Sequence, residues 1–196
     1  MTDRDRDAAG RARNARPRDG LGRPLSFEQA DSAMATMPDD LVLDGWAAAR
    51  LGDELLRAGR PFHAHEVFEA SWKSGPPAER ELWQGLAQLA VGLTHAHRGN
   101  ARGAVTLLRR GTARVRAYCG AARDAGAGAR GAGAGGAAAR DAGAGGAGAG
   151  RAGAVYGMDL PGVLAACDEL AARIERQGLA GIPVADLCPR LLAVVC

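Results

Sequence analysis

A chain of 196 residues is long enough for one ordinary domain of roughly 100 to 150 residues together with tails or linkers. Its 25 basic and 22 acidic residues nearly balance, so bulk charge alone does not indicate a nucleic-acid binder, and no window of 18 residues is apolar enough to cross a membrane. The four cysteines form no CxxC pair and no apolar stretch follows the charged N-terminus, so we expect a reduced, cytoplasmic protein without a structural zinc site.

The first part of the chain divides into a tail and a helix. Half of the first twenty residues are charged and no apolar period is visible, so residues 1–38 are predicted to be a disordered tail. Between residues 39 and 58, apolar side chains recur at three- and four-residue steps, as in Leu43, Trp46 and Leu51. This spacing predicts an amphipathic helix that ends at Gly59.

Two further helices follow closely. Pro61 fits the first turn of a second helix that runs through Trp72 to a break at SGPP. A third helix, residues 78–98, has no charged side chain between Leu82 and His97, which is typical of the centre of a bundle. Three small residues on one side of it would allow a neighbouring backbone to approach closely: Gly85, Gly92 and Ala96. All three tryptophans are expected in the core: Trp46, Trp72 and Trp83.

The fourth helix is predicted over residues 101–119, with one apolar and one basic face. The basic face could contact phosphates, but it lacks interleaved aromatic residues, so we interpret it as a solvated surface. It consists of Arg102, Arg109, Arg110, Arg114 and Arg116.

The rest of the chain begins with a low-complexity segment. In residues 120–154, 29 of 35 residues are Gly or Ala, which favours a flexible linker. A fifth helix follows, with Asp159 as its N-cap, and residues 187–195 should dock on the bundle as a short helix or an extended flap. The predicted fold is therefore all-α: a single compact bundle of about five helices, with a core at 39–119 and its C-terminal part at 155–196.

Polar residues are predicted to form a cluster inside this bundle. On a helical wheel, His65 and Glu69 share an arc with Phe62, Phe68 and Trp72, whereas His63 falls outside it. On the third helix, Gln84, Gln88 and His95 form a polar line that an antiparallel neighbour would face. The predicted buried cluster comprises His65, Glu66, Glu69, Gln84, Gln88 and His95.

Several functions are compatible with such a cluster. It could be a structural hydrogen-bond network, which is the simplest reading. It could hold a metal, with His65, Glu69 and His95 as ligands, or a small ligand, and such a site could be hydrolytic. It could also perform general acid–base catalysis with His65, Glu66 or Glu69. An interaction module is a further alternative, and a homo-oligomer stays open. The sequence identifies no cofactor, substrate or partner.

The two central helices also resemble a known family. The segments FHAHEVFEASWK and LWQGLAQLAVGLTHAHRGNARGAVTLL resemble the bacterial and plastid family that carries the domain of unknown function DUF309, over about residues 46–118. The Gly/Ala tract departs from the family pattern. The resemblance implies a compact multi-helical fold and no particular reaction. Its signature positions here are His65, Glu66, Glu69, Trp72, Gln84, Gly85, Gln88, His95, Gly99, Asn100, Gly103 and Ala104.

Overall fold

The computed structural model describes residues 17–26, 28–29, 37–38, 41–131 and 154–192. Five α-helices make up most of this part of the chain, which confirms the predicted all-α fold. The helices are α1 (Gly45–Arg57), α2 (Pro61–Ser74), α3 (Arg80–His97), α4 (Ala101–Gly131) and α5 (Leu160–Gln177). Two short 3-10 helices, η2 (Pro77–Glu79) and η3 (Val184–Leu187), and a two-stranded hairpin of β1 (Ala154–Val155) and β2 (Met158–Asp159) complete the fold.

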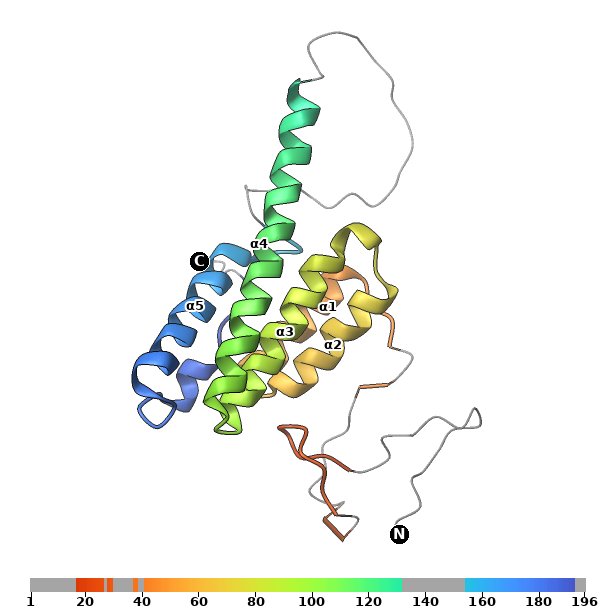
Figure 1. Ribbon diagram of the computed structural model, residues 1–196. Helices are drawn as coiled ribbons and strands as arrows, with labels where there is room; N and C mark the ends of the chain where they lie inside the picture. Colours follow the sequence, from red (N-terminus) through yellow and green to blue (C-terminus); the bar gives the residue numbers. More distant parts are fainter. Residues whose placement is uncertain (1–16, 27, 30–36, 39–40, 132–153, 193–196) are drawn as a thin grey trace.

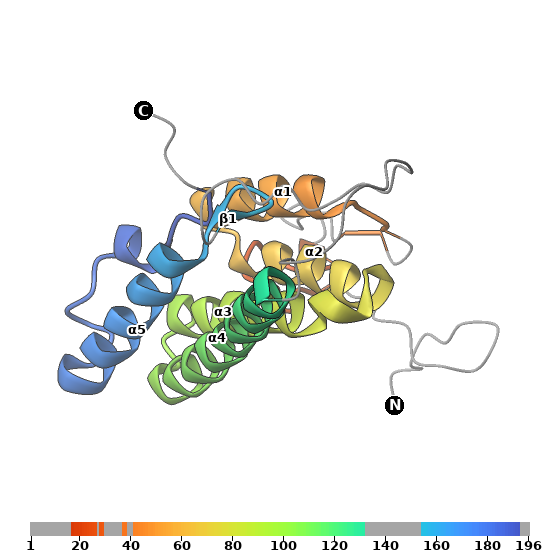
Figure 2. The ribbon, with the colours of Figure 1, turned by 90° about the horizontal axis from the view of Figure 1, so that it is seen from above.

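Each helix packs against the next one in the chain, and α3 lies at the centre. Contacts join α1 to α2, α2 to α3, α3 to α4 and α4 to α5 (Figures 1 and 2). The leucines Leu82, Leu86, Leu89 and Leu93 of α3 are all buried. The helix without a charged side chain between Leu82 and His97 is therefore the centre of the bundle, as its composition predicts.

Helices α3 and α4 approach each other closely at glycine residues. A methyl group on Gly85 would lie 2.6 Å from Val115 Cγ2 and 3.1 Å from the carbonyl oxygen of Gly111. A methyl group on Gly111 would lie 2.8 Å from the carbonyl oxygen of Gly85, and one on Gly92 would lie 3.0 Å from the backbone nitrogen of Leu108. The predicted small-residue side of the third helix is therefore its contact with α4.

Helix α4 is longer than the sequence analysis predicts. It was expected to end at Cys119 but continues to Gly131, and its C-terminal end projects beyond the other helices (Figure 1). Extending an existing helix avoids the cost of nucleation, and alanine has the highest helix propensity, so the first part of the Gly/Ala tract can continue the helix. Residues 132–153 of the predicted linker lie outside the described residues.

The β1–β2 hairpin carries an aromatic cluster that the sequence analysis missed. Its two-residue turn is Tyr156–Gly157, both with positive φ, as a type I′ turn requires. The Tyr156 ring stacks on Trp83 at 5.8 Å between centroids, and its hydroxyl donates to Glu79. Trp46 stands edge-on to Tyr156 and is 53% exposed, so its predicted core position is wrong. It covers the hairpin from outside.

The C-terminal segment returns to α1 and is held there by a buried carboxylate. Asp53 is only 4% exposed, and its Oδ1 accepts hydrogen bonds from the backbone N–H groups of Leu191 and Leu192, at 2.8 and 3.1 Å. Its Oδ2 pairs with Arg57 at 2.8 Å. Residues 188–192, which follow η3, form no helix, and Leu192 is bridged to Met158, in agreement with the flap alternative. Residues 193–195 of the predicted segment lie outside the described residues.

Part of the predicted N-terminal tail is described and contacts the bundle. Residues 17–26 form a tight turn beside the start of α2 and the end of α3, and the Met37 backbone N–H donates to Glu66 Oε2 at 3.2 Å. Residues 1–16 and 30–36, also predicted as disordered tail, lie outside the described residues. None of the helices that the structure describes is both long and apolar enough to cross a bilayer.

Substituting one glycine that is packed against a neighbouring helix and one that has open space around it tests the α3–α4 contact. Gly85→Ala should lower the free energy of unfolding by about 1 to 3 kcal/mol, because the new methyl group meets Val115 and the backbone of α4. Gly120→Ala, on α4 with nothing within 4 Å, should raise it by about 0.5 to 1 kcal/mol. Urea denaturation measures both, and equal effects of the two substitutions would contradict the described packing.

Removing the buried carboxylate tests how the C-terminal segment is attached. Asp53→Ala leaves the two N–H groups of Leu191 and Leu192 without their acceptor, so we expect the free energy of unfolding to fall by about 3 kcal/mol. The exposed neighbour Glu54→Ala is the matched control and should change it by less than about 0.5 kcal/mol. Chemical denaturation of both variants gives the comparison.

Candidate functional site

The buried side of α2 is rotated from the predicted one. Of the predicted arc only Phe68 is buried, while Phe62, His65, Glu69 and Trp72 are partly exposed. His63, expected outside the arc, is 1% exposed. The physical reason is that α2 packs between α1 and α3, so its buried side faces both helices and the two large aromatic residues Phe62 and Trp72 cover its edge.

On the partly exposed side of α2, three charged or ionisable residues follow one another at helical spacing. His65 Nε2 lies 3.4 Å from Glu69 Oε2, and Glu69 Oε1 pairs with Lys73 Nζ at 2.9 Å. Burial lowers the pKa of His65 below its ordinary value; Glu69 and the nearby Ala87 carbonyl oppose this shift, and Lys73 adds to it. His65 therefore reaches α3, as expected, and is neutral at pH 7.

The polar residues of α3 bind to different neighbours. Gln84 Oε1 accepts from Arg114 of α4 at 2.7 Å, and the same guanidinium pairs with Glu81 at 2.8 Å. His95 Nδ1 lies 2.8 Å from Asn100 Nδ2, while Asn100 Oδ1 caps α4 by accepting from Gly103 N–H. Because that N–H fixes the orientation of the amide, Nδ1 of His95 is the acceptor and its proton lies on Nε2.

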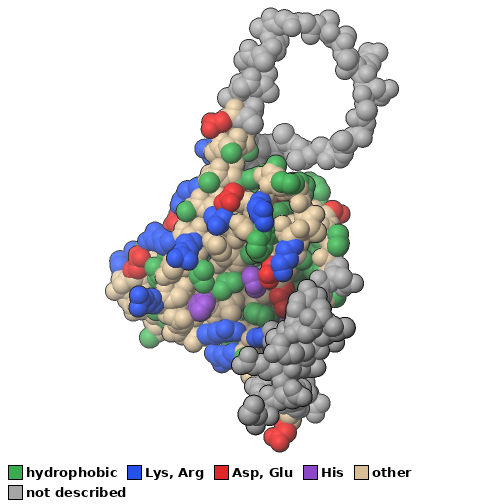
Figure 3. All heavy atoms as spheres, turned by 45° about the vertical axis from the view of Figure 1, so that its right-hand side comes forward, with side chains coloured by type: hydrophobic (Ala, Val, Ile, Leu, Met, Phe, Trp, Pro, Cys, Tyr) green, Lys and Arg blue, Asp and Glu red, His purple; other side chains and the backbone are tan. Residues whose placement is uncertain are grey.

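The six predicted cluster residues are not a buried network. All of them are partly exposed, whereas the buried polar side chains are Asp53, His63, Ser71, Thr94 and Thr112. The expectation of a polar cluster inside the core is therefore wrong. The residues lie instead at the outer edge of the α2–α3 contact, and Figure 3 shows histidine side chains at the surface of this face among basic and acidic ones.

The structure does not support the metal hypothesis. Within residues 41–131 and 154–192 and the shorter described segments, no three His, Cys, Asp or Glu side chains are placed so that they could hold a metal ion. His65 and Glu69 are neighbours, but His95 is engaged by Asn100. A chelate of His65, Glu69 and His95 is therefore not formed, because the three residues serve separate local contacts.

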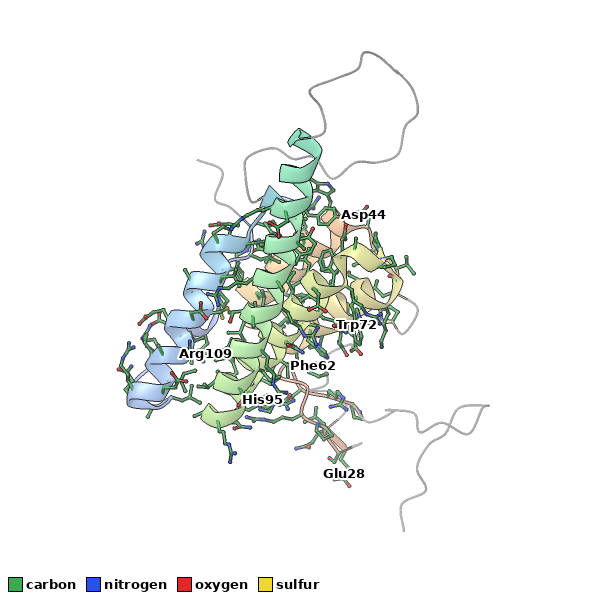
Figure 4. The ribbon with its side chains drawn as sticks, turned by 45° about the horizontal axis from the view of Figure 1, so that its top comes forward. Glu28, Asp44, Phe62, Trp72, His95 and Arg109 are labelled. Atoms are coloured by element: carbon green, nitrogen blue, oxygen red, sulfur yellow. The ribbon has the colours of Figure 1, made fainter. Side chains whose placement is uncertain are left out.

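One part of this edge contains buried polar atoms whose hydrogen bonds are not made. His65 Nδ1 and Trp72 Nε1 on α2 and Gln88 Oε1 on α3 are inaccessible to solvent and have no hydrogen-bond partner among the described residues. The Ala87 carbonyl is close enough to act on His65, yet no bond of normal geometry forms. We call these three residues, with Glu69 between the two on α2, the polar edge. Figure 4 labels Trp72 on this side of α2.

The basic face of α4 is partly neutralised by acidic residues. Arg109 pairs with Glu175 at 2.8 Å, Arg116 pairs with Asp168, and Arg114 pairs with Glu81. The partners of Arg109 and Arg116 lie on α5, so these ion pairs tie α5 to α4 (Figure 4 labels Arg109). Such contacts are surface ion pairs and do not point to a phosphate site.

The fold and the polar edge define an all-α domain of five packed helices with a partly exposed polar face. Residues 50–107 match the family model described as "Domain of unknown function (DUF309)" and form a DUF309 domain, which confirms the resemblance found in the sequence. All twelve signature positions lie within this range.

A curated relative shares part of this region. The chain is 46% identical over 48 residues to "Uncharacterized protein YpuF" of Bacillus subtilis (strain 168). The match covers 24% of this chain and 28% of that protein, so the chain spans less than a third of its relative. No solved structure gives a significant match.

Stability should depend on pH through the partly buried histidines. Burial lowers the pKa of both His65 and His97 in the folded state, whereas the unfolded chain titrates near the ordinary value of 6.5. As the pH falls below 6.5, the unfolded chain binds protons that the folded chain does not, so the stability present at neutral pH is progressively lost.

The comparison that isolates this effect uses the free energy of unfolding at about pH 7.5 and about pH 5.5. His65→Gln and His97→Gln should each reduce the loss between the two values, because each removes one of the two shifted groups. The double variant should reduce it most. An unchanged loss in both single variants would show that carboxylates alone cause the acid sensitivity.

Proposed function

We propose that the polar edge binds a small, neutral ligand that carries hydroxyl or amide groups. The observation that supports this most directly is the set of three buried polar atoms, His65 Nδ1, Trp72 Nε1 and Gln88 Oε1, without partners in the described chain. A buried polar group left without a hydrogen bond costs about 1 to 3 kcal/mol, so three on one helix contact are expensive for stability alone.

A purely structural network accounts for these atoms less well. Its members would have to satisfy one another, since a partly satisfied network is worse than an apolar contact. Here Gln84 and His95 are satisfied by Arg114 and Asn100, away from His65, and Gln88 contributes an acceptor without a donor. Functional sites are the places where such local costs are kept.

The donors and acceptors indicate the chemistry of the ligand. The indole Nε1–H of Trp72 can only donate, the Gln88 oxygen can only accept, and the neutral His65 ring can do either at Nδ1. A hydroxyl or amide group offers both roles at once. Of the charged groups nearby, Glu69 is already paired with Lys73, and the Arg80 guanidinium lies over the Trp72 ring, 5.8 Å from its centroid. A neutral ligand therefore fits better than an ionic one.

Two glutamine variants distinguish a role in ligand binding from a role in stability. Gln88→Leu removes the unpaired oxygen and should raise the free energy of unfolding of the ligand-free protein by about 1 kcal/mol while abolishing binding. Gln84→Leu is the matched control one turn earlier, because its oxygen is occupied by Arg114. It should keep binding and lose stability.

Binding is read from the Trp72 indole N–H resonance in a two-dimensional NMR spectrum, assigned with Trp72→Phe, during a screen of small neutral alcohols and amides. A concentration-dependent shift of this resonance in wild type and Gln84→Leu, absent in Gln88→Leu, supports the proposal. No shift with any compound, together with higher stability of Gln88→Leu, would mean that the edge is only hydrated.

A further inference from the structure

A second surface lies beside the polar edge, where residues 17–25 contact the bundle. These residues form a compact turn: the Leu25 N–H donates to the Pro17 carbonyl, and the Asp19 N–H donates to the Arg23 carbonyl. Asp19 Oδ1 accepts from the backbone N–H groups of Leu21 and Arg23, at 2.9 and 2.7 Å. The turn therefore holds its own shape through Asp19, and its tip at Leu21 and Gly22 is presented to the helices.

The surface that receives the tip has an aromatic and a cationic part. Gly22 lies flat against the Phe62 ring at the start of α2, so closely that a methyl group on it would be 2.3 Å from the ring. Arg98, which follows α3, donates to the Leu21 carbonyl, from Nε at 3.0 Å and also from Nη2. We call Phe62 and Arg98 the turn seat. Figure 4 shows Phe62 next to the N-terminal segment.

The contact requires a glycine at the tip for two independent reasons. Gly22 has φ of +72°, a conformation that residues with a Cβ rarely adopt. Any Cβ would also overlap the Phe62 ring. The seat thus selects a particular backbone shape: a left-handed glycine against the ring, with the preceding carbonyl turned toward a guanidinium.

The chain adds two weaker contacts around the seat. The Arg18 guanidinium covers the Phe62 ring, with its central carbon 5.6 Å from the centroid, and donates to the Gly22 carbonyl. Farther along, the Met37 N–H donates to Glu66 Oε2, on the turn of α2 that follows Phe62. Most of these contacts go to backbone atoms of the N-terminal segment, so they depend on its backbone shape more than on its side chains.

From this geometry we propose that Phe62 and Arg98 form a recognition site for a glycine-tipped peptide turn, which the chain's own residues 17–25 occupy. The site is separate from the polar edge and needs no ligand there. A peptide of the same sequence supplied separately competes for the seat, and the attached segment normally excludes it because it is always present at high effective concentration.

The test uses the full chain and a fluorescent peptide with the sequence PRDGLGRPLS of residues 17–26. In the Gly22→Val chain the attached turn cannot dock, so the seat is open and the peptide should bind, as measured by fluorescence anisotropy. The wild-type chain should bind it at least tenfold more weakly. Gly22→Ala is the milder second variant and should behave in the same way, in case valine perturbs folding.

Three controls make the result specific. Gly59→Ala introduces a backbone strain similar to that of Gly22→Ala, because φ of Gly59 is +69°, but the new methyl group meets no neighbouring atom. The turn of residues 17–25 stays docked in this variant, so peptide binding should not increase. A peptide with valine in place of Gly22 should not bind the open seat. Adding Phe62→Ala to the Gly22→Val chain should abolish binding. Failure of the peptide to bind either Gly22 variant, or equal binding of the valine peptide, would overturn the proposal.

Discussion

The close packing of α3 against α4 is the contact on which the other parts of the structure depend. Gly85 and Gly111 allow the two backbones to approach until a methyl group on either would lie within 3.1 Å of a carbonyl oxygen of the other. Beside these glycines the contact is filled by Leu89 of α3 and by Leu108 and Val115 of α4. The position of α3 then fixes where α2 can pack, because the loop between them is short.

This arrangement also explains why the polar residues lie at an edge. With α2 on one side and α4 on the other, α3 has one strip of surface that neither neighbour covers completely, and Gln84, Gln88 and His95 occupy it at steps of four and seven residues. The matching strip of α2 carries His65, Glu69 and Trp72. The residues of this edge are therefore partly exposed, although His65 Nδ1, Trp72 Nε1 and Gln88 Oε1 are themselves covered.

The sequence predicts the helices well because each carries a local signal. The N-cap Asp159, Pro61 in the first turn of α2 and the charge-free stretch of α3 from Leu82 to His97 are all local signals, and the structure confirms them. The predicted buried side of α2 is wrong because a helical wheel shows only which residues share a side. It does not show that α2 contacts both α1 and α3, so that Phe68 and His63 are both buried. The glycine content of the tract predicts that α4 ends at Cys119, but continuing a formed helix avoids the cost of nucleation, so α4 extends to Gly131.

Contacts between distant parts of the chain could not be predicted from periodicity. Asp53 looks like one more charged residue on an amphipathic helix, and only the return of Leu191 and Leu192 shows why it is buried. In the same way Gly22 lies in a charged segment without any apolar period, and its role depends on a ring 40 residues later in the sequence. The Tyr–Gly pair of the hairpin was the one such signal that turn chemistry could have supplied.

The two proposed surfaces share a single turn of α2, and this adjacency constrains how they could act together. Phe62 forms the turn seat, and its ring centroid lies 6.4 Å from that of His65 on the polar edge. The residue after His65, Glu66, binds the Met37 N–H of the N-terminal segment. The contact between the rings of Phe62 and His65 is therefore a direct link between a docked turn and a bound ligand. Coupling between binding sites is reciprocal. If a ligand that reorients His65 changes the affinity for the peptide by some factor, the bound peptide changes the affinity for that ligand by the same factor.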